Sequence, residues 1–301
     1  MPSRSVRGTR APAWFVVVLI AGCASPGASP DTGTATSTAS RSVAPSVATE
    51  TPSAAAATPR VTARPNPMAS PVVDARFAVA SDGRKLKMTC WGEGSPTILL
   101  ESGHPIGGIE QFERNGADFT KLLANERRVC AYDRAGYGSS DPAPNEPRDL
   151  DDVTDDLRAL LAAADVDGPY VLAGASFGGF IVTYYTHRFP DGVRGVVLID
   201  VPAPSATMTL AQEPPLAWNS PENPEHVDVI PEFENRLAKE QFPFEAPLLV
   251  ITATRGQSNV ADQAFWLEWS TSSRQIELAG EHSVYWQQPR AVADAILGMG
   301  D

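Results

Sequence analysis

The segment YVLAGASFGGFIV, residues 170–182, surrounds one serine, Ser176, with glycines directly after an apolar run. Its centre, GASFG, fits the pattern G-x-S-x-G and lies between a predicted strand and a predicted helix. Glycine permits a tight, strained turn at such a junction, because larger side chains would collide with the strand and the helix. The turn would expose the serine hydroxyl at a helix N-terminus, where developing negative charge is favoured. We therefore predict that Ser176 is a nucleophile; the alternative is a glycine-rich turn with a bystander serine.

A serine hydroxyl becomes a good nucleophile only when a base removes its proton, and the chain has four histidines. His187 falls inside the helix predicted after the turn, His226 falls in a proline-rich segment, and His104 follows a different strand. His282 lies between the last predicted strand and the last predicted helix. Loops in that position lie at the carboxyl end of the sheet, beside the turn that carries the serine. We predict that His282 is the general base; the alternative is a surface-loop histidine.

Strands and helices alternate along the chain from Asp74 onward. The predicted strands cover residues 76–80, 85–92, 96–102, 127–133, 169–174, 193–200, 247–253 and 274–278, and the predicted helices cover 109–126, 150–166, 178–189, 262–270 and 288–299. A short turn joins the first two strands, which predicts a hairpin. Later strands are separated by helices, which implies parallel crossovers and a sheet covered on both faces. The predicted fold class is therefore α/β.

The alternation stops over residues 203–245, which are rich in proline and acidic residues. Connections this long inside a compact domain are usually functional. The segment also carries large apolar side chains, namely Leu216, Trp218, Phe233 and Phe242. We predict a small lid over about 203–245; the alternative is a mobile surface excursion.

Several motifs occur together in a familiar order: SGHP at 102–105, YDRAGYGSSD at 132–141, GASFGG, VVLID and EHSVYWQQPRAVADAI. Because these motifs follow one another in the order found in the α/β-hydrolase superfamily, residues 74–301 resemble that superfamily. The resemblance implies an α/β-hydrolase fold, with a mostly parallel eight-stranded sheet, helices on both faces and a small lid. It also implies an oxyanion hole made by the backbone amides of His104 and Phe177.

The acid of the expected Ser-His-Asp triad departs from the commonest superfamily pattern. That pattern places a carboxylate after the seventh strand, where this chain reads ITATRGQS, residues 251–258, without one. Some members take the acid from the end of the sixth strand, where Asp200 stands in VVLIDVP. We predict that Asp200 orients His282. Asp262 is the reserve candidate, with a helix N-cap as its alternative role.

The N-terminus has the order of a targeting signal. Arg4, Arg7 and Arg10 precede the apolar run APAWFVVVLIA, which is too short to span a bilayer. The run ends in IAGC, residues 20–23, which resembles a bacterial lipobox. We predict a signal peptide over 1–22, lipidation of Cys23, and export to the outer side of the cell membrane; the alternative is an ordinary secretory peptide. Residues 23–73 contain no aromatic residue and predict a disordered tether.

The other two cysteines, Cys90 and Cys130, form an even pair. In an exported chain such a pair permits a disulfide, and two buried thiols are the alternative. The superfamily resemblance places their strands side by side, which favours the disulfide.

These features predict a serine hydrolase that cleaves small carboxylic esters through an acyl-enzyme on Ser176, without a cofactor or metal. Thioesterase, lactonase, peptidase or perhydrolase chemistry would use the same groups, and a catalytically idle, surface-anchored binding domain is a further alternative. A net charge of -12 without a basic patch argues against nucleic-acid binding. Dehalogenase and epoxide-hydrolase chemistry need a carboxylate nucleophile at the turn, and a metal enzyme needs clustered ligands that the sequence lacks.

Overall fold

A computed structural model describes residues 70–80, 82–113, 118–256 and 258–300. The predicted signal peptide, Cys23 and nearly all of the predicted tether lie outside the described residues. Within the described part of the chain, no helix is both long and apolar enough to cross a membrane.

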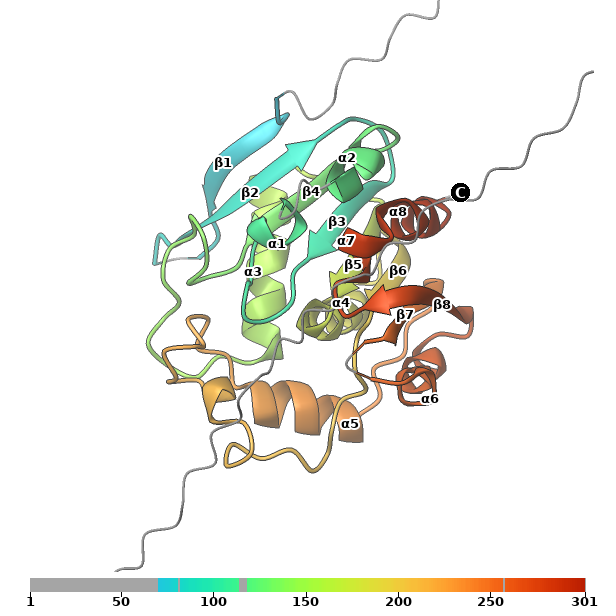
Figure 1. The fold of residues 1–301 in the computed structure, drawn as a ribbon. Helices are drawn as coiled ribbons and strands as arrows, with labels where there is room; N and C mark the ends of the chain where they lie inside the picture. Colours follow the sequence, from blue (N-terminus) through green and yellow to red (C-terminus); the bar gives the residue numbers. More distant parts are fainter. Residues whose placement is uncertain (1–69, 81, 114–117, 257, 301) are drawn as a thin grey trace, which may run out of the picture. The chain divides into compact units, whose positions relative to one another are not determined.

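The described residues form an eight-stranded sheet with the order β1-β2-β4-β3-β5-β6-β7-β8 (Figure 1). The strands are β1 (Val73–Ala78), β2 (Lys85–Trp91), β3 (Thr97–Glu101), β4 (Val129–Asp133), β5 (Tyr170–Ala175), β6 (Val193–Ile199), β7 (Leu248–Arg255) and β8 (Ser273–Glu281). β2 is antiparallel to both β1 and β4, and all other neighbours are parallel. Every residue of β3 and β4 is buried, as expected for strands covered on both faces.

Helices cover both faces of the sheet (Figure 1). One hydrophobic core lies under α3 (Leu150–Ala163) and α4 (Phe177–Arg188). The other lies under α1 (Glu110–Glu113), α2 (Asp118–Ala124), α7 (Val284–Gln287) and α8 (Pro289–Leu297). The helix predicted over 109–126 is therefore two helices, and the weak helix formers Asn115 and Gly116 separate them in the sequence. Residues 262–270 are also not one helix, because α6 (Val260–Gln263) passes into the 3₁₀ helix η3 (Ala264–Trp269).

Residues 203–245, here called the lid, contain η1 (Pro214–Leu216), the π-helix η2 (Val229–Arg236) and α5 (Leu237–Lys239), and Figure 1 shows them in yellow and orange at one end of the sheet. Arg148 anchors the lid through its backbone, donating to His226 O at 2.8 Å and accepting from Asp228 N at 2.7 Å. The ring of Phe233 is fully buried and packs 4.6 Å from the ring of Phe177 in α4. These contacts hold the lid against the sheet domain.

A disulfide joins Cys90 of β2 to Cys130 of β4, which lie directly opposite each other in the antiparallel pair. The two cysteines are 40 residues apart in the sequence. Closing a loop of this length lowers the conformational entropy of the unfolded chain. In the loop-entropy model this stabilises the folded protein by about 4 kcal/mol. The bond therefore ties the first hairpin to the parallel part of the sheet.

Candidate active site

Ser176 occupies the turn between β5 and α4 with φ 51° and ψ -126°, a backbone conformation that non-glycine residues rarely adopt. Its amide donates to Ile199 O at 3.0 Å, and its carbonyl accepts from Gly179 N at 2.8 Å. A Cβ at position 174 would lie 2.5 Å from Gly178 O, so only glycine fits where the strand and the helix meet. Ser176 is therefore held at the apex of a strained strand-to-helix turn.

His282 follows β8, Asp200 follows β6, and the structure brings their side chains together. His282 Nδ1 lies 2.7 Å from Asp200 Oδ2, and Asp200 is fully buried. Asp200 Oδ1 accepts hydrogen bonds from Gln263 Nε2 at 2.8 Å and from Ala253 N at 3.1 Å. Burial raises the pKa of Asp200, but the hydrogen bonds from His282, Gln263 and Ala253 together outweigh it, so the pKa lies below its usual value.

An ionised Asp200 accepts but cannot donate, so the proton of a neutral His282 belongs on Nδ1. His282 Nε2 is then left as a hydrogen-bond acceptor. This is the tautomer that can take a proton from a serine hydroxyl.

The Asp200 carboxylate occupies the space that a side chain directly after β7 would need. Gly256 directly follows β7, and a Cβ there would lie well inside van der Waals contact of Asp200 Oδ2. A side chain at position 256 and the Asp200 carboxylate therefore exclude each other. Position 256 therefore cannot carry an acid while Asp200 stands beside it.

Asp262, the reserve candidate for the acid, is exposed in the first turn of α6. Its Oδ2 accepts from Asn259 Nδ2 at 2.6 Å, and its amide donates to Asn259 Oδ1 at 2.9 Å. The N-cap residue of α6 is therefore Asn259, so the N-cap role considered for Asp262 is wrong. The structure does not bring Asp262 to His282.

Ser176, His282 and His104 line one cavity of about 70 Å³. The backbone before His104 runs close against the turn, because a Cβ at Gly103 would lie 3.1 Å from Ser176 Cβ. Phe177 is the residue after Ser176 and begins α4. The two segments predicted to supply the oxyanion hole therefore flank Ser176.

The remaining histidines lie in other surroundings. His187 is exposed near the end of α4, with Nδ1 3.1 Å from Pro243 O. His226 lies in the lid, with Nδ1 2.6 Å from Pro144 O. Neither lines the cavity beside Ser176.

Two glutamines support the site, and sequence reasoning missed both. Gln263 donates to Asp200 and accepts from Thr252 Oγ1 at 2.8 Å. Gln111 in α1 accepts from Gly103 N at 2.7 Å and donates to Tyr285 Oη at 2.9 Å. Neither residue belongs to a local motif, and each has a partner distant in sequence, Asp200 for Gln263 and Tyr285 for Gln111, so no sequence signal marks them.

A buried charge cluster lies behind the loop that carries His104. The Arg134 guanidinium, 2% exposed, donates to Glu101 Oε1 at 2.7 Å and to both oxygens of Glu225 at 2.7 and 2.8 Å. Tyr132 Oη donates to Glu101 Oε2 at 2.6 Å. Burial raises the pKa of Glu101 to about 7, although Arg134 and Tyr132 oppose this shift. Arg134 had a sequence signal, since it lies inside YDRAGYGSSD directly after a buried strand, whereas Glu225 had none.

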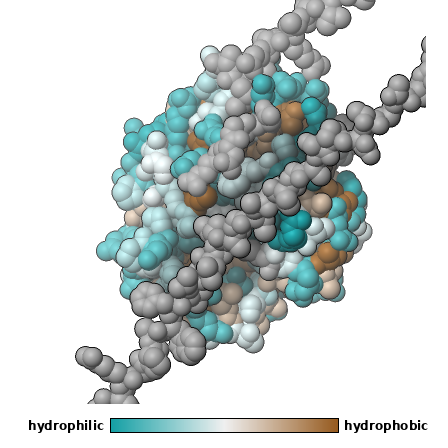
Figure 2. All heavy atoms as spheres, viewed as in Figure 1, coloured by the Kyte–Doolittle hydropathy of each residue, from teal (hydrophilic) through white to brown (hydrophobic). Residues whose placement is uncertain are grey.

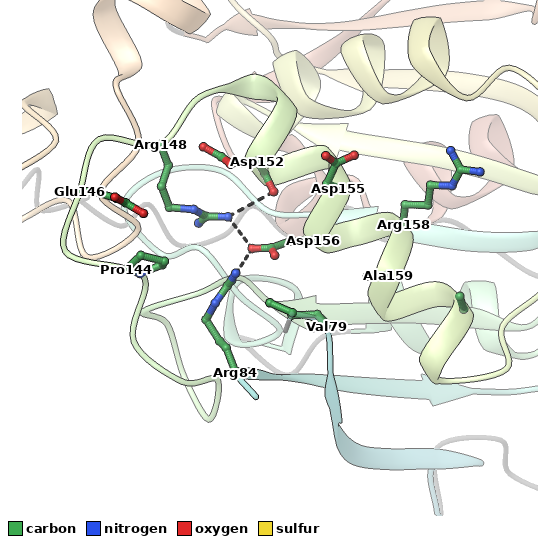
Figure 3. Close-up of a pocket in the computed structure, with 12 residues that line it drawn as sticks. Val79, Arg84, Pro144, Glu146, Arg148, Asp152, Asp155, Asp156, Arg158 and Ala159 are labelled. Carbon is green, nitrogen blue, oxygen red and sulfur yellow. Dashed lines mark hydrogen bonds and ion pairs between the residues drawn. The ribbon is translucent and has the colours of Figure 1, made fainter. Parts of the chain in front are cut away.

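A wider cleft of about 500 Å³ lies between α3 and the turn from β1 to β2 (Figure 3). Asp156 of α3 pairs there with Arg84 at 2.6 Å and also with Arg148. None of the residues that line this cleft also lines the cavity beside Ser176. The charges therefore hold the turn against α3, and the wider cleft is separate from the candidate active site.

Within the described residues, no group of three or more His, Cys, Asp or Glu side chains is arranged to hold a metal ion.

Comparisons with known proteins agree with this architecture. A family model described as alpha/beta hydrolase fold matches residues 96–225. YbdG of Bacillus subtilis is 28% identical over 128 residues, covering 42% of this chain and 38% of the relative. The bifunctional esterase/perhydrolase DCH of Acinetobacter calcoaceticus is 29% identical over 172 residues, covering 56% of each chain. The structure of a thermophilic esterase from Thermogutta terrifontis matches with a TM-score of 0.63 and 18% identity, over 75% of this chain and 97% of that one.

Together with the strand order, these matches show that the chain has the α/β-hydrolase fold and confirm the predicted fold class. The family-model match supports its placement in the α/β-hydrolase superfamily over residues 96–225. The chain spans only 38% and 56% of the lengths of the two curated relatives.

Proposed function

We propose that the protein is a serine hydrolase that cleaves carboxylic esters through an acyl-enzyme on Ser176. The observation that carries this proposal is the arrangement of three residues. Ser176 lies at a strained strand-to-helix turn and lines the same cavity as His282, whose Nδ1 is held by a buried Asp200 at 2.7 Å. This is the arrangement in which a base can activate a serine hydroxyl.

In the proposed reaction, His282 Nε2 takes the proton of Ser176 Oγ as this oxygen attacks the ester carbonyl carbon. The amides of His104 and Phe177 stabilise the resulting oxyanion. Collapse breaks the bond to the alcohol oxygen, which leaves with the proton from His282. Water then attacks the acyl-enzyme with His282 again as base, releasing the carboxylic acid and restoring Ser176. If hydrogen peroxide replaces water in this step, the product is a peracid, the chemistry that the name of the Acinetobacter relative includes.

Labelling with a fluorophosphonate tests this proposal. The phosphorus should react with Ser176 Oγ with loss of fluoride, and mass spectrometry of peptides should place the adduct on Ser176. Prior acylation by a slowly hydrolysed ester should block the label. An unlabelled but folded protein would instead support the idle binding domain.

We expect short aryl esters to be cleaved faster than long-chain triglycerides. The cavity of about 70 Å³ has room for roughly two water molecules at their share of liquid volume. Large hydrophobic side chains exposed on the described surface are Val72 and Leu210, and Figure 2 shows a mostly hydrophilic face with scattered hydrophobic spots. Such a surface is poorly suited to an oil–water interface. A series of nitrophenyl esters from acetate to palmitate, with tributyrin and triolein, should show kcat/KM falling with chain length; a rising series would contradict the expectation.

A lipid anchor on Cys23 completes the proposal, with the protein exported and held at the outer side of the bacterial membrane. Cys23→Ser should shift the protein from the detergent phase to the aqueous phase in Triton X-114 partitioning, because the modified thiol would be lost. The specific activity should not change, since residue 23 is separated from β1 by about fifty residues of sequence. Partitioning that is the same in both proteins would refute the anchor.

A further inference from the structure

The peptide between Gly103 and His104 carries the amide that the proposed mechanism uses for the oxyanion. Its carbonyl, Gly103 O, accepts hydrogen bonds from Gly107 N at 3.0 Å and from Arg134 Nη2 at 3.2 Å. This peptide is not among the cis bonds of the described residues, so its C=O and N–H point in opposite directions. Whatever holds Gly103 O therefore also directs the N–H of His104.

Arg134 contacts this loop at several points. Its Nη1 donates to Ser102 O at 2.5 Å and to Ser102 Oγ at 3.0 Å. Its backbone amide donates to Gly107 O at 3.1 Å. The side chain of Arg134 therefore binds the Gly103 end of the turn, and its main chain binds the Gly107 end.

The guanidinium is itself fixed, because its remaining donors are taken by two buried carboxylates. Glu101 binds Nη1, and Glu225 of the lid binds Nε and Nη2 as a two-pronged pair. Both glutamates are fully buried. A planar guanidinium held at both edges has little freedom, so its position relative to Gly103 O is set by the protein.

A cationic donor on a carbonyl oxygen also changes the amide on the other side of the peptide. Hydrogen bonds in a chain polarise one another, and the effect is larger where water is excluded. The bond from Arg134 to Gly103 O therefore makes the N–H of His104 a stronger donor.

We propose that Arg134 is a positioning residue that directs and polarises the His104 amide for the oxyanion, and that Glu225 couples this function to the lid. The catalytic meaning of this inference rests on the proposed serine-hydrolase function. The competing explanation is that the cluster is only a buried ion network, which would affect folding without a specific effect on the transition state.

Two variants separate these explanations. Arg134→Lys keeps the charge, but the three donors of an ammonium cannot replace the planar guanidinium, which makes six side-chain hydrogen bonds. Its kcat should fall on the order of 10²-fold, comparable to the loss of one oxyanion donor, while KM changes by less than about threefold. Glu225→Gln keeps the shape and one acceptor oxygen, and it should lower kcat by roughly 10-fold. The inhibition constant of an aryl boronic acid, which forms a tetrahedral adduct on the serine, should rise by the same factors as kcat falls.

Arg84→Lys is the matched control, because Arg84 is also a largely buried arginine paired with a carboxylate, but it lies in the wider cleft of Figure 3. It should lose stability and keep kcat and the boronic acid affinity. All variants are compared at equal folded fraction. If Arg134→Lys does not fold, Glu225→Gln carries the test. A folded Arg134 or Glu225 variant with the kcat and boronic acid affinity of Arg84→Lys would overturn the proposal.

A readout independent of catalysis comes from labelling with ¹⁵N-histidine, since the chain has only four histidines. The backbone ¹⁵N resonance of His104 should shift in Glu225→Gln and Arg134→Lys, because the hydrogen bond on Gly103 O changes, while those of His187 and His282 stay in place. An unchanged His104 resonance would refute the contact. If the wild-type protein is not labelled by the fluorophosphonate, the proposed function fails. The shift of the His104 resonance still decides whether Arg134 directs the peptide between Gly103 and His104.

Discussion

Ser176→Ala is expected to lower kcat for a short aryl ester by about 10⁵–10⁶-fold, as removal of the nucleophile does in serine proteases. The substitution removes the only atom that can form the proposed acyl bond, while the turn, the oxyanion donors and His282 remain. The fluorophosphonate adduct should disappear with the activity. The measurement is a burst and steady-state assay with nitrophenyl acetate on protein of matched folded fraction.

Ser270→Ala provides a control for the loss of a serine hydroxyl away from the cavity. Ser270 is buried after η3, where its Oγ donates to Ala246 O at 2.8 Å, and it does not line the cavity beside Ser176. Its kcat should stay within about twofold of the wild type. If Ser176→Ala keeps more than a thousandth of the activity, another group is the nucleophile, and the proposed mechanism is wrong.

The turn that carries Ser176 was predictable because its whole physical cause is local. Glycines at 174 and 178 stand within two residues of the serine, and the strand and helix that they separate are contiguous in the sequence. The α/β class was predictable for a related reason, since buried parallel strands must be apolar throughout and their crossover helices must be long. The positions of Ser176 and His282 therefore followed from patterns that a single sequence displays.

The supporting groups could not be found in this way, because each depends on contacts between distant segments. Arg134 and Glu225 are separated by 91 residues, and Gln111 and Tyr285 by 174. No periodicity or motif connects such pairs, and Glu225 lies in an irregular part of the lid. Burial of a charge beside its partner is a property of the packed chain, so it becomes visible only in the structure.

The placement of Asp200 is an intermediate case. The sequence VVLID predicted that Asp200 lies at the end of a strand. The choice between Asp200 and Asp262 as the acid needed the resemblance to a known superfamily. The structure adds the reason, because Gly256 leaves the space that the Asp200 carboxylate occupies and Asp262 is bound to Asn259 at the surface.

Asp200→Asn is therefore expected to lower kcat by about 10³–10⁴-fold with little change in KM. The hydrogen bonds around Asp200 determine how the new amide is oriented. Ala253 N and Gln263 Nε2 both donate to Oδ1, so the carbonyl oxygen of Asn should take that side. Its NH₂ group then faces His282 Nδ1, which must become an acceptor. The proton moves to Nε2, and His282 can no longer accept the proton of Ser176 Oγ.

Asp262→Asn is the comparison that decides the assignment. Asp262 is exposed, and the hydrogen bond from its backbone amide to Asn259 Oδ1 does not depend on the charge of its side chain. Its kcat should stay within about twofold of the wild type. Asp200 is fully buried, so thermal unfolding must first show that Asp200→Asn is folded under the assay conditions. A folded Asp200→Asn with nearly full activity would remove Asp200 from the mechanism. A large loss confined to Asp262→Asn would transfer the acid to Asp262, although the structure pairs His282 with Asp200.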